Sequence, residues 1–353
     1  MPAILSASHA DPPHAFSQEF LKAAVVQLYS GRIPDTDVQR IEDVFEHSRI
    51  RERAFLMPLD WYLAPRTPQE RNRAYMEDGL AILARASRGC LEKADCRPDQ
   101  VDHVIFVSTT GLSTPSLDSY LINELGLPRK TTRLPVWGLG CAAGAAGISR
   151  AFDHCLAHPE ARVLLASLET CSLNFAQEDL SKKNLVAMSL FADAASAVLV
   201  AGDAVEGEGP QVIATRSHLF PDSYRIMGWD VAEGGFRLVL SPKLPELVRN
   251  ELRPLVDSFL LSRDLSRRDI VHYLTHPGGA KVVDAIRDAL GLSNGELRIS
   301  EEVLRDHGNV SSASVLIVLE RWMADGGGTE AGEFGLLSAF GPGFSAELVL
   351  LRA

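Results

Sequence analysis

The feature that most constrains the fold is a duplicated order of segments. Three kinds of segment occur twice: an apolar stretch ending in small polar residues, a glycine followed by one reactive or polar residue and a small-residue run, and a short Ser-initiated apolar stretch. The pairs are 104–109 with 271–276, 140–146 with 308–314, and 196–200 with 345–349. The spacings agree, since Cys141 lies 32 residues after Thr109 and Asn309 lies 33 residues after His276. This order predicts a duplicated α/β unit with approximate twofold symmetry. The alternative is chance similarity between generic α/β segments.

Helical and β-rich periodicities alternate along the chain, which predicts layers of helices on sheets. Helices are expected at 67–92, 116–125, 279–290 and 311–323, and strands at 104–107, 162–166, 270–274, 334–338 and 346–351. The acidic, glycine-bearing stretch 203–210 reads as the boundary between the halves. We therefore expect an N-terminal unit at 1–204 and a C-terminal unit at 205–353.

Composition excludes several classes of protein. The 353 residues are 46% hydrophobic and 23% charged, close to the globular average, so disordered and collagen-like chains are excluded. The net charge of -11 argues against a nucleic-acid binder, which needs a broad basic face. An anionic ligand must therefore be held by a local basic patch.

The cysteines and the N-terminus indicate the compartment. The five cysteines are an odd number without metal-finger spacing, which favours reduced thiols in a cytoplasmic protein. The first residues lack the pattern of a signal peptide, and no apolar run approaches the ~20 residues that span a bilayer. We expect a soluble, cytoplasmic protein without a membrane span.

Cys141 stands at the start of a predicted helix built of very small residues. The positive end of a helix dipole lowers a thiol pKa from its free value of ~8.5, which favours the nucleophilic thiolate. The small neighbours leave room for a substrate or a second helix. A buried structural cysteine is the competing interpretation.

His276 and Asn309 are the matching candidates in the second half. His276 follows a buried strand at the edge where α/β proteins place their sites, and Asn309 precedes a small-residue helix. Each has a structural alternative, a packed histidine and a helix N-cap. The predicted symmetry places both near Cys141. A Cys–His pair activates a nucleophile, and an Asn amide can donate a hydrogen bond to an oxyanion. This suits acyl-thioester formation followed by enolate stabilisation.

Five segments in order resemble the signatures of type III polyketide synthases, the chalcone synthase-like branch of the thiolase fold. They are 137–144 (WGLGCAAG), 189–193 (SLFAD), 276–279 (HPGG), 307–313 (HGNVSSA) and 340–344 (FGPGF). The similarity runs from about residue 44 to the C-terminus. It implies a thiolase-like fold of two pseudo-symmetric α/β halves in an α-β-α-β-α layered arrangement, and a homodimer.

The resemblance assigns roles residue by residue. It implies that Cys141 is the acyl-carrying nucleophile, and that His276 and Asn309 polarise the thioester carbonyl of malonyl-CoA as carbon dioxide leaves. Phe191 and Phe236 match the pair of gatekeeping phenylalanines between the CoA tunnel and the cavity. The loop formed by Gly341, Pro342 and Gly343 is expected to shape the cavity wall. Ala192, Ala194 and Ala339 depart from the usual glycines, which puts the cavity dimensions in doubt.

Within the family, the segments 108–116 and 227–230 are closer to bacterial long-chain alkylpyrone and alkylresorcinol synthases. Thr110 and Cys171 fall where some of these enzymes border a tunnel for a fatty acyl chain. For Cys171, simple core packing is the alternative.

A basic segment near residue 50 is the candidate site for CoA phosphates. Arg49, Arg51 and Arg53 supply guanidinium groups, which suit phosphate oxygens. The alternative is a solvated helix end. His154 and His158 have a spacing that could ligate zinc on one helical face, but no further ligand lies in their segment, so a surface helix is favoured.

The predicted protein is an acyltransferase that loads an acyl-CoA starter, extends it iteratively with malonyl-CoA, and cyclises the product to an alkylpyrone or alkylresorcinol. No metal or cofactor beyond the CoA thioesters is required. The nearest alternative is a ketoacyl synthase III-like enzyme that performs one condensation, although such enzymes follow the histidine with Gln-Ala-Asn instead of the Pro-Gly-Gly at 277–279. A non-catalytic acyl-binding protein of the same fold is less favoured because the reactive residues are intact.

Overall fold

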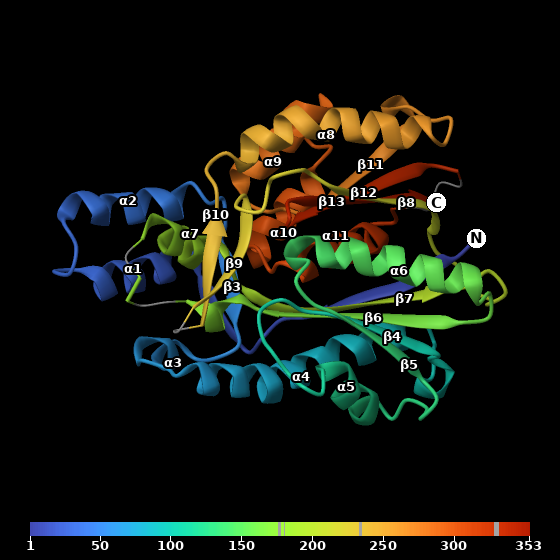
Figure 1. Cartoon of the computed structure of the whole chain (residues 1–353), viewed down its shortest axis with the longest axis horizontal. Helices are drawn as coiled ribbons and strands as arrows, with labels where there is room; N and C mark the ends of the chain where they lie inside the picture. Colours follow the sequence, from blue (N-terminus) through green and yellow to red (C-terminus); the bar gives the residue numbers. More distant parts are fainter. Residues whose placement is uncertain (176–177, 180, 233–234, 328–331) are drawn as a thin grey trace.

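The fold is organised around one long mixed sheet that runs across the molecule (Figure 1). The computed structural model describes residues 1–353 except 176–177, 180, 233–234 and 328–331. Nine strands form the sheet in the order β11 (Ile270–Thr275), β12 (Phe334–Gly341), β13 (Ser345–Arg352), β8 (Gln211–Leu219), β1 (Ala3–Ala10), β7 (Asp193–Ala201), β6 (Arg162–Thr170), β4 (His103–Val107) and β5 (Thr132–Val136).

The sheet consists of two halves with the same strand directions. In the first half β4 is parallel to β6, β6 is antiparallel to β7, and β7 is antiparallel to β1. The second half repeats this with β11, β12, β13 and β8. The halves meet where β1 pairs with β8 at Ala3 and Gln211. The duplication predicted from the sequence is therefore present in the fold, with β4 matching β11 and β7 matching β13.

Helices cover both faces of each half and give the five layers (Figure 1). The central layer is α6 (Ala143–Ala157) with α11 (Ser312–Ala324). The outer layers are α4 (Pro68–Lys93) with α5 (Leu117–Leu125) on one side, and α8 (Leu244–Leu261), α9 (Ala280–Leu290) and α10 (Arg298–His307) on the other. A Cβ on Gly144 would lie only 2.3 Å from the carbonyl oxygen of Ser312. The small residues of α6 are thus required for the close approach of the two central helices.

The helix predicted at 67–92 shows how local chemistry sets a boundary. The Thr67 side chain accepts a hydrogen bond from the backbone N–H of Glu70, and the Glu70 carboxylate accepts one from the Thr67 N–H. This capping box, with Pro68 in the first turn, begins α4 one residue later than predicted. The helix predicted at 116–125 ends at Gly126, which has the left-handed φ of +68°.

A lobe at one end of the sheet was not predicted by sequence periodicity. It contains α1 (Gln18–Tyr29), α2 (Asp35–Glu46), α3 (Leu59–Leu63) and α7 (Lys182–Leu190), with the paired strands β2 (His14–Ser17) and β3 (Glu52–Phe55). The hairpin of β9 (Met227–Ala232) and β10 (Gly235–Leu240) lies beside α7 (Figure 1). Short 3-10 turns lie at Pro98–Gln100, Gly140–Ala142, Cys171–Asn174 and Arg267–Asp269.

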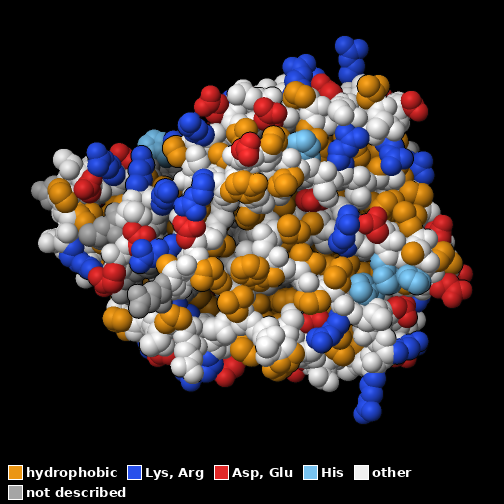
Figure 2. All heavy atoms as spheres, viewed as in Figure 1, with side chains coloured by type: hydrophobic (Ala, Val, Ile, Leu, Met, Phe, Trp, Pro, Cys, Tyr) orange, Lys and Arg blue, Asp and Glu red, His pale blue; other side chains and the backbone are white. Residues whose placement is uncertain are grey.

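Charged side chains are distributed over the surface. Basic and acidic groups are interspersed on the face shown in Figure 2, without a continuous basic region. Among the described residues, no helix combines the length and apolar character needed to cross a membrane.

Candidate active site

Cys141 lies on the tight 3-10 turn that leads from β5 into α6, and its residue surface is only 6% exposed. Gly140 has the left-handed φ of +50°, and a Cβ there would lie 2.7 Å from Pro342 Cδ. A Cβ on Gly341 would lie 2.3 Å from the carbonyl oxygen of Leu139. The predicted wall loop therefore packs directly against the turn that carries the thiol, and glycine is required on both sides of this contact.

Asn309 is held by both its backbone and its side chain. Its N–H donates to the carbonyl of Leu190 at 2.9 Å, and its carbonyl accepts from the N–H of Ala192 at 3.0 Å. The side-chain Nδ2 donates to the carbonyl of Gly278 at 3.2 Å, while Oδ1 accepts from the N–H of Ser311 at 2.8 Å. The amide orientation is therefore determined, with the N–H₂ group directed toward the loop that follows His276.

His276 lies just beyond the C-terminal end of β11, buried at 2% exposure. Its backbone N–H donates to the carbonyl of Ser338 on β12 at 2.8 Å, which extends the sheet pairing by one residue. Neither ring nitrogen has a hydrogen-bond partner among the residues that the structure describes. Burial lowers the pKa of the imidazole from 6.5 to about 3, so the ring is neutral. A buried, unpartnered imidazole is available for hydrogen bonding to a substrate.

The thiol of Cys141 lies close to Ser311, two residues after Asn309. Its Sγ is 3.6 Å from the hydroxyl oxygen of Ser311. Burial raises the pKa of the thiol to about 12, and hydrogen bonds from Ser311 and Asn309 only partly oppose this. The prediction of a lowered thiol pKa was therefore wrong for the free protein, because desolvation outweighs the effect of the helix start. The resting pair is a neutral thiol and a neutral imidazole.

Glu169, which the sequence analysis did not single out, is a buried acid next to this site. It lies near the end of β6 with 0% exposure. Its carboxylate accepts from the Thr109 N–H at 3.1 Å and from the Thr110 hydroxyl at 2.9 Å, and the Ser312 hydroxyl donates to it as well. Burial raises its pKa from 4.5 to about 7. The signal available in the sequence was an acid at the end of an otherwise apolar strand.

Replacement of Glu169 by Gln is expected to change how stability depends on pH. Between pH 4.5 and 7 the folded protein binds more protons at Glu169 than the unfolded chain, so the free energy of unfolding falls as pH rises through this window. Gln keeps the shape but cannot titrate. The stability of the wild type relative to Glu169→Gln should decline by roughly 1–3 kcal/mol from pH 5 to pH 8, as measured by urea denaturation.

The control for this prediction is Glu124→Gln, which removes an exposed carboxylate on α5. Its stability should parallel that of the wild type across the same pH range. A constant difference between wild type and Glu169→Gln at every pH would contradict the prediction.

A row of aromatic rings connects the two predicted gatekeepers. Phe191 forms a backbone bridge with Asn309, and its ring centroid is 6.3 Å from that of Trp229. Trp229 is in turn 6.3 Å from Phe236, and Phe236 is 6.3 Å from the exposed Trp137. The β9–β10 hairpin thus carries an aromatic path from the surface to the buried Phe191. Periodicity alone did not indicate Trp137 or Trp229 as part of this path.

Thr110 and Cys171 both lie buried close to the reactive cysteine. The Thr110 hydroxyl donates to Glu169 and accepts from the Thr170 N–H at 2.8 Å. Burial raises the pKa of Cys171 well above its ordinary value, with Glu169 and Asp193 adding to the effect. Cys171 belongs to an apolar cluster against which Phe175 packs. The core-packing alternative for Cys171 therefore remains consistent with its surroundings.

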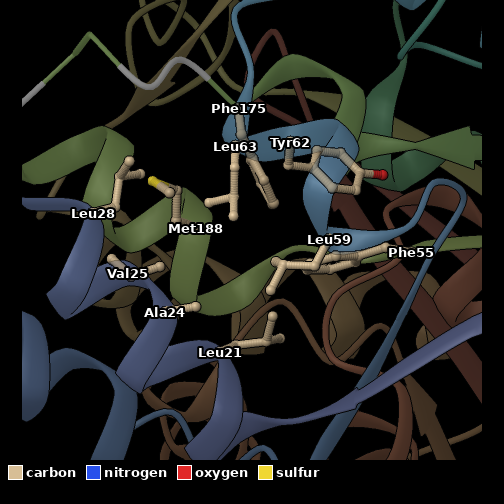
Figure 3. Close-up of a pocket in the computed structure, with 10 residues that line it drawn as sticks. All are labelled: Leu21, Ala24, Val25, Leu28, Phe55, Leu59, Tyr62, Leu63, Phe175 and Met188. Carbon is tan, nitrogen blue, oxygen red and sulfur yellow. The ribbon is translucent and has the colours of Figure 1, made fainter.

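An apolar cavity of about 60 Å³ is lined in part by Phe175 (Figure 3). The side chains that line it come from α1, β3, α3 and α7 as well as Phe175 itself: Leu21, Ala24, Val25, Leu28, Phe55, Leu59, Tyr62, Leu63 and Met188. The Tyr62 hydroxyl is 2.6 Å from the Ser172 hydroxyl, next to Cys171. Phe175 thus packs against the apolar cluster that contains Cys171 and also lines this cavity.

Arg49 and Arg51 are exposed, and each is paired with a carboxylate. Arg49 donates two hydrogen bonds of 2.8 Å to Asp284, and Arg51 is 3.1 Å from Asp306. Arg49 borders a groove of about 360 Å³ that contains further arginine and glutamate side chains: Arg298, Arg305, Glu301 and Glu302. This mixed groove is accessible to an anionic ligand.

Arg53 does not join them, and its predicted contact with CoA phosphates does not fit its position. The side chain is fully buried and donates to Gln18 Oε1 at 2.9 Å and to the Phe191 carbonyl at 2.7 Å. Burial lowers its pKa to about 9. Arg51 precedes β3 and is exposed, whereas Arg53 lies within β3, whose last three residues are all buried. Arg53 instead hydrogen-bonds the backbone carbonyl of Phe191, the first predicted gatekeeper.

Two family models match the chain. The N-terminal domain of chalcone and stilbene synthases matches residues 62–204, and the C-terminal domain matches residues 211–353. Together they cover most of the sequence.

Individual proteins are similar over nearly the whole length. A putative chalcone synthase of Bacillus subtilis is 40% identical, with 99% of this chain and 98% of that protein covered. The 1,3,6,8-tetrahydroxynaphthalene synthase of Streptomyces peucetius is 39% identical, covering 97% of this chain and 90% of that protein. The solved structure of 1,3,6,8-tetrahydroxynaphthalene synthase from Streptomyces coelicolor, a bacterial type III polyketide synthase, superposes with a TM-score of 0.92 at 30% identity, over 99% of each chain.

Proposed function

Because the chain belongs to the chalcone and stilbene synthase family, and is thus a type III polyketide synthase that condenses acyl groups carried as CoA thioesters, we propose that Cys141, His276 and Asn309 perform its chemistry. The observation that carries the assignment is the convergence of the three residues. Ser311 contacts the thiol of Cys141 and the amide of Asn309, and Gly278 links that amide to the loop of His276.

The loading step follows from the neutral resting state. The Cys141 thiol attacks the carbonyl carbon of an acyl-CoA while the His276 imidazole accepts the thiol proton. The C–S bond to CoA then breaks, and the proton passes to the leaving CoA thiolate. The products are free CoA and an acyl thioester on Cys141. The lowered pKa of His276 keeps the imidazole unprotonated in the resting enzyme, although it also makes the ring a weaker base.

The extension step uses the same imidazole as a donor, together with Asn309. Both groups hydrogen-bond the thioester carbonyl oxygen of malonyl-CoA, so negative charge gathers there when the C–C bond to the carboxylate breaks and carbon dioxide leaves. The enolate carbon attacks the acyl carbonyl on Cys141, and the cysteine sulfur leaves. The chain is then two carbons longer, carried on CoA, and can be reloaded for another cycle.

We propose that the starter is a fatty acyl group and that the product is an alkylpyrone or alkylresorcinol. Support comes from the apolar cluster around Cys171 and from the apolar cavity in Figure 3, which share Phe175 as a neighbour. At about 60 Å³ this cavity accommodates a few methylene groups. It therefore suits the tip of an alkyl chain whose thioester lies at Cys141.

A second candidate is an aromatic product of the kind named for the relatives, such as 1,3,6,8-tetrahydroxynaphthalene. The identity of 39% over nearly the whole chain favours it. The two candidates differ in whether the apolar cavity takes part in substrate binding.

Filling the cavity is expected to shorten the longest starter that is accepted. Ala24→Phe places a ring into the cavity from α1, whereas Ala23→Phe adds the same ring on the exposed side of that helix. With malonyl-CoA and acyl-CoAs of graded length, mass spectrometry should show loss of the longest products, by at least tenfold in rate, for Ala24→Phe alone.

Two outcomes would contradict the fatty acyl starter. One is that the wild type accepts only short or aromatic acyl-CoAs. The other is that both phenylalanine variants keep the wild-type chain-length profile.

We also propose CoA contacts for Arg49 and Arg51 and a homodimeric assembly. Arg49 borders the groove beside α9 and α10, and Arg51 lies near it. Each can exchange its carboxylate partner for a phosphate group of CoA.

The edge strand β5 supports the homodimer. It exposes Leu134 and is followed by the exposed Trp137, which supports burial of this edge by a second copy. Light scattering of the purified protein measures the assembly.

A further inference from the structure

A second cluster of reactive side chains lies outside the active site, where the end of β1 meets the end of α10. It contains His9, Asp11 and His307. Each offers one atom that could bind a metal, an imidazole nitrogen or a carboxylate oxygen, and these three atoms lie within 4.8 Å of one another. One oxygen of Asp11 is 3.7 Å from His9 Nε2, and the other is 3.1 Å from His307 Nδ1. The imidazole rings meet edge to face at 5.1 Å. This arrangement lets nitrogens of both rings approach one point beside the carboxylate.

We propose that this cluster binds one divalent transition-metal ion, best matched by Zn²⁺, through His9 Nε2, His307 Nδ1 and the Asp11 carboxylate. Two imidazoles and a carboxylate are a common zinc ligand set, with water in the fourth position. Ligand atoms about 2.0–2.2 Å from a tetrahedral ion lie about 3.3–3.6 Å apart. The two oxygens of Asp11 lie 3.7 Å from His9 Nε2 and 3.1 Å from His307 Nδ1, and the three ligand atoms spread over up to 4.8 Å, so the side chains would have to close around the ion.

The surroundings of His9 match those of a metal-bound histidine. Its other ring nitrogen, Nδ1, is 2.5 Å from Glu320 Oε2 on α11. The second oxygen of Glu320 accepts from Lys93 Nζ at 2.6 Å, which fixes the carboxylate. Metal-ligating histidines commonly donate their free N–H to such a carboxylate, which orients the ring and strengthens it as a ligand. Glu320 thus supplies an outer contact that leaves Nε2 directed to the metal.

The position of the cluster indicates a structural role for the ion. His9 and Asp11 come from the first half of the chain, and His307 is the last residue of α10 in the second half. A cation at this helix end also faces the negative end of the helix dipole. His307 is two residues before Asn309, so the ion would tie β1 to the segment that enters the active site.

Another group of histidines provides a matched comparison. The rings of His103 and His154 are stacked, with their centroids 4.2 Å apart and their planes at 7°. The ring centroid of His158 lies 4.6 Å from that of His154. Parallel stacked rings do not direct their nitrogens to one point between them. Replacement of His154 therefore removes a clustered histidine without affecting the proposed site.

The test is a titration of the chelator-treated full-length chain with Zn²⁺, followed by calorimetry and by thermal unfolding, with Co²⁺ as a spectroscopic probe. The wild type and His154→Gln should bind one ion per chain and unfold at a higher temperature with the metal. Asp11→Asn and His307→Gln should lose this binding and the Co²⁺ absorption. Glu320→Gln, which retains all three ligands, should bind roughly 10- to 100-fold more weakly.

The proposal is overturned if the wild type binds no Zn²⁺ at this stoichiometry, or if Asp11→Asn and His307→Gln keep the wild-type affinity. The cluster would then be an ion-pair network only. If His307→Gln fails to fold, Asp11→Asn decides the matter, because the Asp11 side chain is 41% exposed and its loss leaves no buried gap. All cysteines remain in every variant, so binding by thiols does not distinguish them.

Discussion

Replacing Cys141 by Ala is expected to abolish both the acyl-enzyme and the polyketide product. Alanine cannot form the thioester that holds the growing chain, and a missing nucleophile typically costs at least about 1,000-fold in rate. The substitution removes a sulfur whose hydrogen-bond contact is Ser311, so the fold should persist. Intact-protein mass spectrometry after incubation with acyl-CoA measures the loading, and chromatography measures the product.

The matched control is Cys155→Ala, which removes a buried cysteine from α6, the helix that follows the turn of Cys141. Its thiol packs in the apolar core and hydrogen-bonds the backbone carbonyls of Ala161 and Val200, so loading should be unaffected. Cys141→Ala should still release carbon dioxide from malonyl-CoA, because His276 and Asn309 remain. Product formation at the wild-type rate by Cys141→Ala would refute the proposed nucleophile.

Asn309→Asp is expected to preserve acyl loading while it impairs decarboxylation, which is the reverse of the result expected for Cys141→Ala. The substitution replaces the amide donor by a carboxylate, which repels the developing enolate and the carbonyl of Gly278. Loss of one such donor lowers the catalytic rate constant about 100- to 1,000-fold. Acyl loading onto Cys141 should continue, whereas release of carbon dioxide from malonyl-CoA and product formation should fall together. Radiolabelled malonyl-CoA measures the decarboxylation.

Asn123→Asp provides the control for this change. Asn123 donates from the same amide atom to a carbonyl oxygen, that of Ser119, on the exposed surface of α5. It should retain wild-type decarboxylation and product formation. If Asn309→Asp lost loading and decarboxylation equally, the residue would act by maintaining the site rather than by stabilising the enolate.

The sequence was most informative where local chemistry and duplication act together. The helix predicted at 67–92 from periodicity begins at Pro68, within one residue of the predicted start, where the Thr67 and Glu70 capping box forms. The repeated segments predicted that β4 corresponds to β11 and β7 to β13, because strands that arise from one duplicated unit keep their directions. Periodicity did not predict α1 and α2, which pack against each other and against α7.

The burial and the neighbours of each side chain, in contrast, were decided only by the tertiary structure. The three arginines near residue 50 look equivalent in the sequence, but Arg53 is buried against Phe191 while Arg49 is exposed. The thiol of Cys141 begins a helix, yet its burial raises its pKa to about 12. Glu169 gives no motif signal and becomes a site neighbour only because β6 brings it beneath Thr109 and Ser312.

The sequence by itself predicted the duplicated α/β architecture and the family, and it supplied the candidates for the reactive residues, since these depend on residue order and spacing. The tertiary structure decided which of those residues are desolvated, which polar atoms lack partners, and which distant segments meet. The proximity of His9 and Asp11 to His307 is an example, because nearly 300 residues separate them along the chain. Solvation and long-range proximity arise from packing, so no local pattern encodes them.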